Sequence, residues 1–112
     1  MIQKAFAVLY NQGLICRAGM KGTKEQATDA LVSRAVERKQ AGEPVAGMAF
    51  FLADDVKDGA YPIHFGAIDT PLGKLGHSTD RVGRSVVKAL KQTGCWCEWD
   101  GDPQHVILVK EN

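Results

Sequence analysis

The chain has 112 residues, of which 45% are hydrophobic and 24% charged, as in an ordinary folded globular protein. This length predicts a single domain over residues 1–112 with one hydrophobic core. The 14 basic and 13 acidic residues nearly cancel, which excludes a strongly basic binder and argues against nucleic acid as a partner.

The compartment is predicted from three further features. The longest apolar stretch, residues 45–53, is far too short to span a membrane. The three cysteines lack the spacing of a disulfide framework. The first residues lack the features of a signal peptide, so we expect a cytoplasmic protein that does not bind membranes.

The first half of the chain predicts two helices and two strands. Apolar residues at helical spacing indicate a helix near residues 2–10, and residues 14–18 form a short candidate strand. Thr23 and Gln26 have the spacing of a capping box, which predicts the start of a second helix. The apolar run at residues 45–53 predicts a buried strand because it is short, continuous and aromatic.

The second half predicts three strands and one helix. Residues 61–68 alternate between two faces as a strand does, and a helix begins near Thr79. Residues 95–99 and 105–109 flank a strong turn signal at residues 100–103, which predicts a C-terminal hairpin.

The order of these elements predicts an α+β fold with a mixed, mainly antiparallel sheet of four to five strands. The middle six elements match the split βαβ order of ferredoxin-like folds, with an added N-terminal helix and C-terminal hairpin strand. Right-handed crossovers in that topology would place the helices on one face of the sheet. An exposed sheet edge can pair with a second copy, so a homodimer is an open alternative, and Pro62 would block such pairing if it lay at an edge.

Cys95, Cys97 and His105 are candidate metal ligands. The two thiols point to the same face of a strand, and the imidazole on the paired strand could approach them, as zinc would require. The spacing lacks the knuckle of structural zinc sites and no fourth ligand is evident, so we interpret the cysteines as core residues and expect no metal.

Asp54, Asp55 and His64 are candidates for acid–base chemistry. The two carboxylates follow the buried strand, and His64 on the next strand could join them. Asp is equally favoured as the cap of the turn that follows, and capping is the default interpretation.

The loop before the third helix is a candidate anion site. Lys74, His77, Ser78 and Thr79 lie where backbone amides of a helix N-terminus could hold a phosphate or carboxylate. The spacing of a P-loop is absent, as is that of a dinucleotide-binding loop, so we expect no cofactor.

Trp96 and Trp99 have opposite parity on their strand and should face opposite sides of the sheet. One of them is expected in the core. Trp96 shares its face with Glu98, so these two residues are the candidate surface for a protein partner.

Over roughly residues 45–110 the sequence resembles a family of small bacterial domains of unknown function. The resembling segments are Gly47 to Phe51, Asp54 or Asp55, Tyr61 to Gly66, Val82 to Arg84, Val86 to Leu90, Glu98 to Gly101, Pro103 and Ile107. Members often carry a small cysteine cluster after the first strand, where this chain has only Cys16. The resemblance implies a folded domain and no particular activity, substrate or catalytic residue.

Together these patterns favour a non-enzymatic binding or accessory module that acts through a protein partner. One alternative is an enzyme that handles a small molecule or anion with Asp54, Asp55 and His64. A further alternative is a toxin-neutralising or regulatory protein.

Overall fold

The structure is a computed structural model and describes residues 2–43, 45–68 and 79–110. Its elements, in chain order, are α1 (Ile2–Asn11), β1 (Leu14–Met20), α2 (Lys24–Gln40), β2 (Gly47–Leu52), the short 3₁₀ helix η1 (Ala53–Asp55), β3 (Ala60–Ala67), α3 (Thr79–Gln92), β4 (Trp96–Glu98) and β5 (Ile107–Lys110). These elements confirm the predicted α+β class. Within the described residues, no helix has both the length and the apolar character needed to cross a bilayer.

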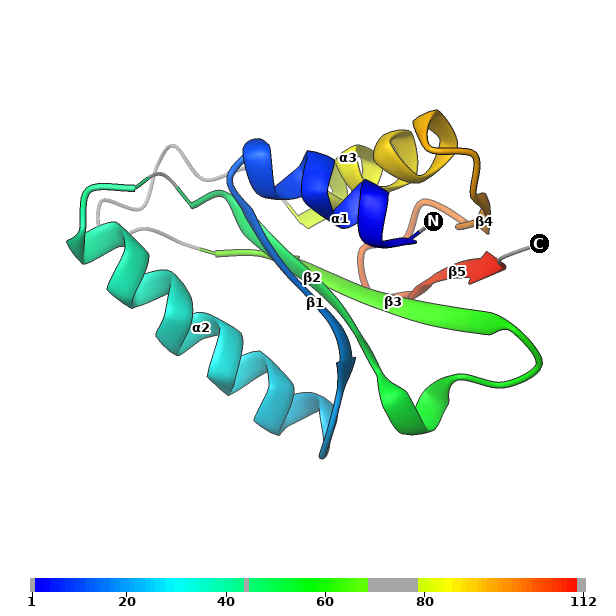
Figure 1. The fold of residues 1–112 in the computed structure, drawn as a ribbon, viewed down its shortest axis with the longest axis horizontal. Coiled ribbons are helices and arrows are strands. Elements are labelled where there is room, and N and C mark those ends of the chain that lie inside the picture. The colour runs from blue at the N-terminus through cyan, green and yellow to red at the C-terminus, as the bar shows by residue number, and fades with distance from the viewer. Residues whose placement is uncertain (1, 44, 69–78, 111–112) are drawn as a thin grey trace.

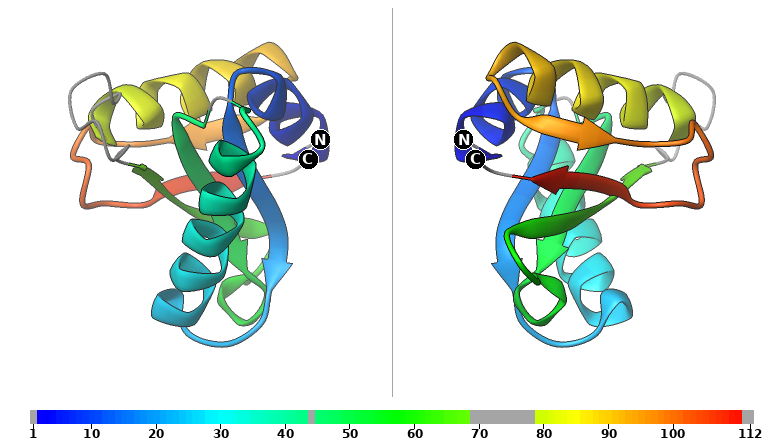
Figure 2. Two further views of the ribbon diagram at one scale, coloured as in Figure 1. Left: turned by 90° about the vertical axis from the view of Figure 1, so that its left-hand side faces the viewer. Right: turned by 90° about the vertical axis from the view of Figure 1, so that its right-hand side faces the viewer.

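The five strands form one mixed sheet with the order β1-β2-β3-β5-β4. β1 and β2 are parallel and every other neighbouring pair is antiparallel, which confirms the predicted mainly antiparallel sheet. β3 changes partner along its length, because residues 64–67 pair with β2 and residues 60–63 pair with β5. The two halves of the sheet therefore run in clearly different directions (Figure 2).

The helices lie on both faces of the sheet rather than on one (Figure 1). α1 and α3 share one apolar core with the sheet, and α2 forms a second core on the opposite face with β1 and β2. The prediction of a single helical face was wrong because the strand order differs from the ferredoxin-like one. In that arrangement another strand separates the two joined by the first crossover helix, whereas here β1 and β2 are hydrogen-bonded neighbours.

Strand direction explains why α2 and α3 lie on opposite faces of the sheet. β3 and β4 both run antiparallel to β5, so they are parallel to each other and antiparallel to β1 and β2. The β1–α2–β2 and β3–α3–β4 crossovers step across the sheet in the same direction with opposite strand orientation. Right-handed crossovers of that kind must place their helices on opposite faces.

Pro62 does not lie in an edge strand, so it does not block the pairing of a sheet edge with a second copy. It lies in β3, an inner strand, opposite Leu108 of β5. Proline removes one backbone donor, and the missing donor is tolerated because pairing of β2 to β3 ends two residues away at His64. The two edges are β1 and the three-residue β4.

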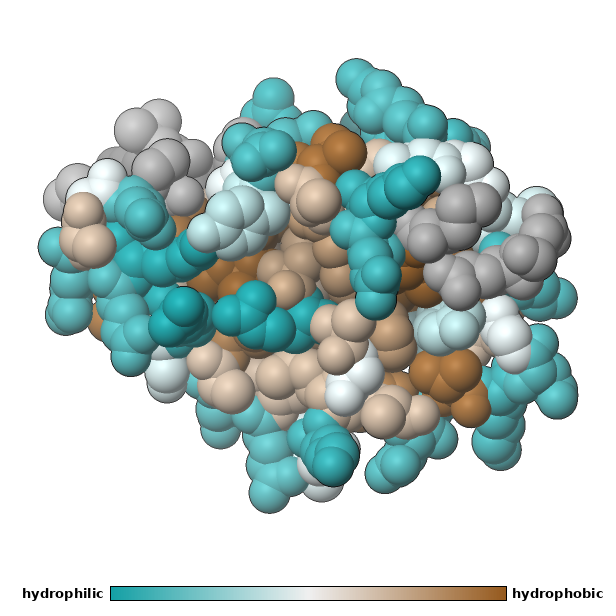
Figure 3. Space-filling model, viewed as in Figure 1, coloured by the Kyte–Doolittle hydropathy of each residue, from teal (hydrophilic) through white to brown (hydrophobic). Residues whose placement is uncertain are grey.

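The view in Figure 3 shows how the two layers meet along the β1 edge. Apolar residues show through the middle of this view, and hydrophilic residues lie mostly around them.

The N-terminus of α2 is fixed by the predicted capping box. The Thr23 hydroxyl accepts from the Gln26 amide at 3.1 Å, and the Gln26 side chain accepts from the Thr23 amide at 2.9 Å.

Gly83 allows α3 to lie close to the sheet. A Cβ atom at this position would lie 2.7 Å from Phe65 Cε2 and 2.8 Å from Trp99 Cη2. These two rings pack edge-to-face with centroids 5.4 Å apart, so neither can move without disturbing the other.

We predict that Gly83→Ala lowers the free energy of unfolding by about 1–2 kcal/mol, because the cost of overpacking exceeds the helix propensity that alanine gains. Urea denaturation measures the change, with the exposed Ser33→Ala in α2 as the control. An unchanged or higher denaturation midpoint for Gly83→Ala would show that the close approach is not constrained.

Candidate functional site

One half of the sheet face on the α2 side is not covered by any described helix. The α2 core takes its strand residues from β1 and β2 and none from β4 or β5. On the same side, the alternate residues of β3, β5 and β4 are half-buried or exposed. We call this set the open sheet face, and it consists of Ala60, Pro62, Leu108, Lys110, Trp96 and Glu98.

Trp96 is the largest apolar side chain on the open sheet face, and 46% of it is exposed. The Lys110 ammonium lies 5.3 Å from the centroid of its ring, a cation–π contact that restricts the indole. Trp99 faces the α3 side, where it is half-buried against Phe65, and its Nε1 donates to the Asp102 carbonyl at 2.9 Å. The two tryptophans thus lie on opposite faces of the sheet.

A cavity of about 400 Å³ lies between the N-terminus of α2, β3 and the segment that precedes β5. Its lining residues are Lys24, His64, Phe65, Pro103, Gln104, His105 and Val106. His64 belongs to the same side of β3 as Pro62, so the cavity adjoins the open sheet face. It brings together two predicted residues, His64 and His105, that are 41 positions apart in the sequence.

His64 is held at depth in this cavity. Its ring stacks on Phe50 with centroids 5.2 Å apart, and its side chain is 15% exposed. The Nε2 atom is buried and has no hydrogen-bond partner among the described residues, while Asp55 Oδ2 lies 4.0 Å away. His64 therefore leaves one buried polar atom unsatisfied beside the cavity.

The two histidines have pKa values shifted in opposite directions. Burial lowers the pKa of His64, the Lys24 ammonium lowers it further, and Asp55 opposes the shift. His105 Nδ1 donates a hydrogen bond to Asp100 Oδ2 at 2.5 Å, which raises the pKa of His105, and the charges of Asp100 and Asp102 add to this. At neutral pH the cavity therefore holds a neutral imidazole at its base.

Of the two aspartates predicted to act with His64, the structure places one close to it. Asp55 is the carboxylate near His64, and both aspartates lie in the exposed η1 helix. Their catalytic role stays a prediction.

The predicted metal ligands are not assembled. Cys95 is buried and Cys97 is half-buried on the α3 side, whereas His105 is exposed and bonded to Asp100. Burial raises the pKa of Cys97, and it raises the pKa of Cys16 to about 12, which makes both thiols poor ligands. In the part of the chain that the structure describes, no group of three His, Cys, Asp or Glu residues could hold a metal ion.

The predicted anion loop lies mostly outside the described residues. Lys74, His77 and Ser78 fall in that segment. Thr79 begins α3, and its hydroxyl accepts from the Ala67 amide at 3.5 Å. This hydroxyl is therefore partnered with β3.

Sequence reasoning missed Lys24 and Gln104, which line the cavity beside His64. It also did not single out the exposed basic residues of α3. Their signal was available, because Arg81, Arg84 and Lys88 recur at helical spacing with a single acid, Asp80, on the whole helix.

Comparison with known proteins identifies a family but no close relative. A family model described as a domain of unknown function, DUF6891, matches residues 1–112. No curated protein and no solved structure matches the chain. The expected resemblance to an uncharacterised family is therefore confirmed, and it extends over the whole sequence rather than residues 45–110 alone.

We predict that His64 titrates below pH 6.5 and His105 above it, because burial opposes charge on one ring and Asp100 favours charge on the other. As the pH falls through about 6.5, His64 becomes protonated in the unfolded chain before it does so in the folded protein. Protonation therefore favours the unfolded state, and His64 lowers the free energy of unfolding in acid. His105 adds stability below about pH 6.5 and loses that contribution as the pH rises through its raised pKa.

Two-dimensional NMR of the imidazole protons measures both midpoints, with peaks assigned from His64→Gln, His77→Gln and His105→Gln. Asp100→Asn should lower the His105 midpoint and leave that of His64 unchanged. Equal midpoints, or a His64 midpoint above 6.5, would contradict the described environments.

Proposed function

The chain belongs to the DUF6891 family, and we propose that it works as a non-enzymatic module that binds a protein partner through the open sheet face. The observation that carries the proposal is the exposure of Trp96, 46% of which is in contact with solvent beside half-buried apolar neighbours. Tryptophan is among the residue types that most often anchor an interface.

The open sheet face has the anatomy of a small interface. Pro62 and Leu108 lie opposite each other at its centre and are half-buried. Lys110 and Glu98 are exposed and form part of its rim. An apolar centre with a polar rim is the common composition of a surface that binds another protein.

The surface is already ordered in the free protein. Strand pairing fixes Trp96 opposite Lys110 and Glu98 opposite Leu108. The cation–π contact at 5.3 Å further restricts the indole, so little side-chain entropy is lost when a partner covers it.

The charges of this face favour a protein over other partners. Its one cation, Lys110, and its one acid, Glu98, balance each other. Neither a polyanion nor an anionic membrane gains from a neutral surface of this kind. A partner that presents apolar side chains with charges of both signs around them complements it.

A second candidate function is the handling of a small molecule at His64. The unpartnered Nε2 atom and Asp55 at 4.0 Å favour it, because a neutral imidazole can accept a proton in acid–base chemistry. His64→Gln would remove such chemistry without affecting a partner that binds around Trp96. A role in toxin neutralisation or other regulation would follow from the identity of the partner.

We predict that Trp96→Ala weakens partner binding at least about 30-fold, the effect of losing an aromatic anchor. The tagged protein is used to isolate a stoichiometric partner from native-host lysate, and the affinity is then measured with purified components by calorimetry. Val36→Ala is the matched control, since Val36 is 48% exposed but lies on α2.

Circular dichroism and urea denaturation of Trp96→Ala must show an intact fold for the comparison to count, and unfolding of this variant would mean that Trp96 is a core residue. Equal affinity of Trp96→Ala and the wild type would place the interface elsewhere. Light scattering on the pure protein tests the homodimer, and a dimer lost in Trp96→Ala would mean that a second copy occupies this face.

A further inference from the structure

A second surface lies on the opposite layer of the protein, on the outer side of α3. Arg81, Arg84, Lys88 and Lys91 are exposed and recur every three or four residues, so they share one face of the helix. With Lys4, the helices α1 and α3 carry five basic residues and one acid, whereas the rest of the chain carries nine basic and twelve acidic residues. A nearly neutral protein thus concentrates its positive charge on one layer.

The basic face carries a shallow, open groove. This groove, of about 480 Å³, is lined among the described residues by Arg81, Arg84, Ser85 and Lys88 of α3. It shares Arg81 and Ser85 with a recess of about 210 Å³ between α3 and the starts of β1 and β2. Together the recess and the groove offer room for a small molecule that lies partly in the recess and partly along α3.

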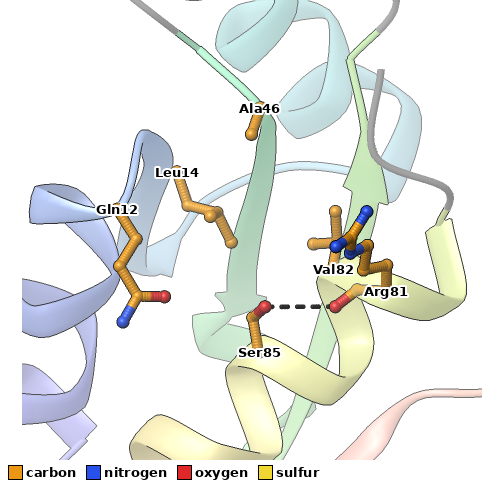
Figure 4. A pocket seen from close by; sticks show the side chains of 6 residues that line it. All are labelled: Gln12, Leu14, Ala46, Arg81, Val82 and Ser85. Carbon is orange, nitrogen blue, oxygen red and sulfur yellow. Dashed lines mark hydrogen bonds between the residues drawn. The ribbon is translucent and has the colours of Figure 1, made fainter. Parts of the chain in front are cut away.

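The recess combines polar donors with an apolar wall. Figure 4 shows the α3 side chains of Arg81, Val82 and Ser85 facing Gln12 and Leu14, with Ala46 at one end. Leu14, Ala46 and Val82 are apolar, while the Gln12 amide lies on the opposite side from the Arg81 guanidinium. The Ser85 hydroxyl donates to the Arg81 carbonyl at 3.1 Å and keeps lone pairs free.

The charged side chains that line the two hollows are all positive among the described residues. Arg84 is paired with Asp80 on the same helix, but Arg81 and Lys88 have no carboxylate partner among the described residues. A ligand with concentrated negative charge would therefore meet two unpaired cations and a third that can be shared.

We propose that the two hollows together bind a phosphorylated small molecule. The phosphate group lies among Arg81, Arg84 and Lys88, and the organic body extends toward Gln12 and the apolar wall. A phosphomonoester carries a charge of about −1.5 to −2 at neutral pH, which matches several cations better than a single carboxylate does. Guanidinium groups also bind phosphate oxygens in bidentate geometry. This site is separate from the open sheet face and does not depend on the proposed protein partner.

The test uses AMP and adenosine as probes, which share an organic body and differ in the phosphate. NMR titration in 150 mM salt is expected to show that AMP shifts the signals of the Gln12 side-chain amide and of the α3 backbone around Arg81. Adenosine at the same concentration should not shift them. Arg81→Gln combined with Lys88→Gln should weaken AMP binding at least about tenfold, because two charge-assisted contacts are lost.

Lys21→Gln combined with Lys57→Gln is the control, since it removes the same charge at exposed positions outside α1 and α3. Equal AMP affinity in the two double variants would overturn the proposal, as would the absence of any shift at 10 mM AMP. A ten-nucleotide oligothymidine that binds more tightly than AMP, with a steep salt dependence, would also overturn it in favour of nucleic acid.

Discussion

The direction of the strands is the constraint on which the rest of the structure depends. Because β1 and β2 run opposite to β3 and β4, two right-handed crossovers that step the same way must send α2 and α3 to opposite faces. α1 joins α3, so one face receives two helices and the other receives only α2. The change of partner along β3 adds the twist that turns β5 and β4 away from α2 (Figure 2).

This unequal covering produces two surfaces of different chemistry. On the side of α2, the sheet beyond β2 keeps Trp96, Leu108 and Pro62 near solvent with balanced charges around them. On the other side α1 and α3 cover the core, and the outer surface of α3 carries a row of cations beside a groove. A protein partner and a phosphorylated ligand could therefore bind the same molecule at once, because their surfaces lie on opposite layers.

The sequence predicted the elements well because their signals are local. The capping box at Thr23 and the turn chemistry of residues 100–103 depend on neighbours in the chain, and both lie where expected. Strand order and the covering of each face are long-range properties, and the ferredoxin-like expectation therefore failed. The site predictions succeeded or failed for the same reason. The exposure of Trp96 follows from strand parity, which is a local property. Lys24 and His64 are 40 positions apart in the sequence, and no local signal predicts that they line the same cavity.

The accessibility of the open sheet face is the central claim, and acrylamide quenching of tryptophan fluorescence tests it most directly. Trp99→Phe leaves Trp96 as the one emitter, and Trp96→Phe leaves Trp99. The structure predicts that Trp96 emission is strongly quenched and red-shifted, while Trp99, half-buried beside Phe65 and Gly83, is protected. If instead Trp96 is the protected residue in the pure monomeric protein, the face is covered and cannot be the partner surface.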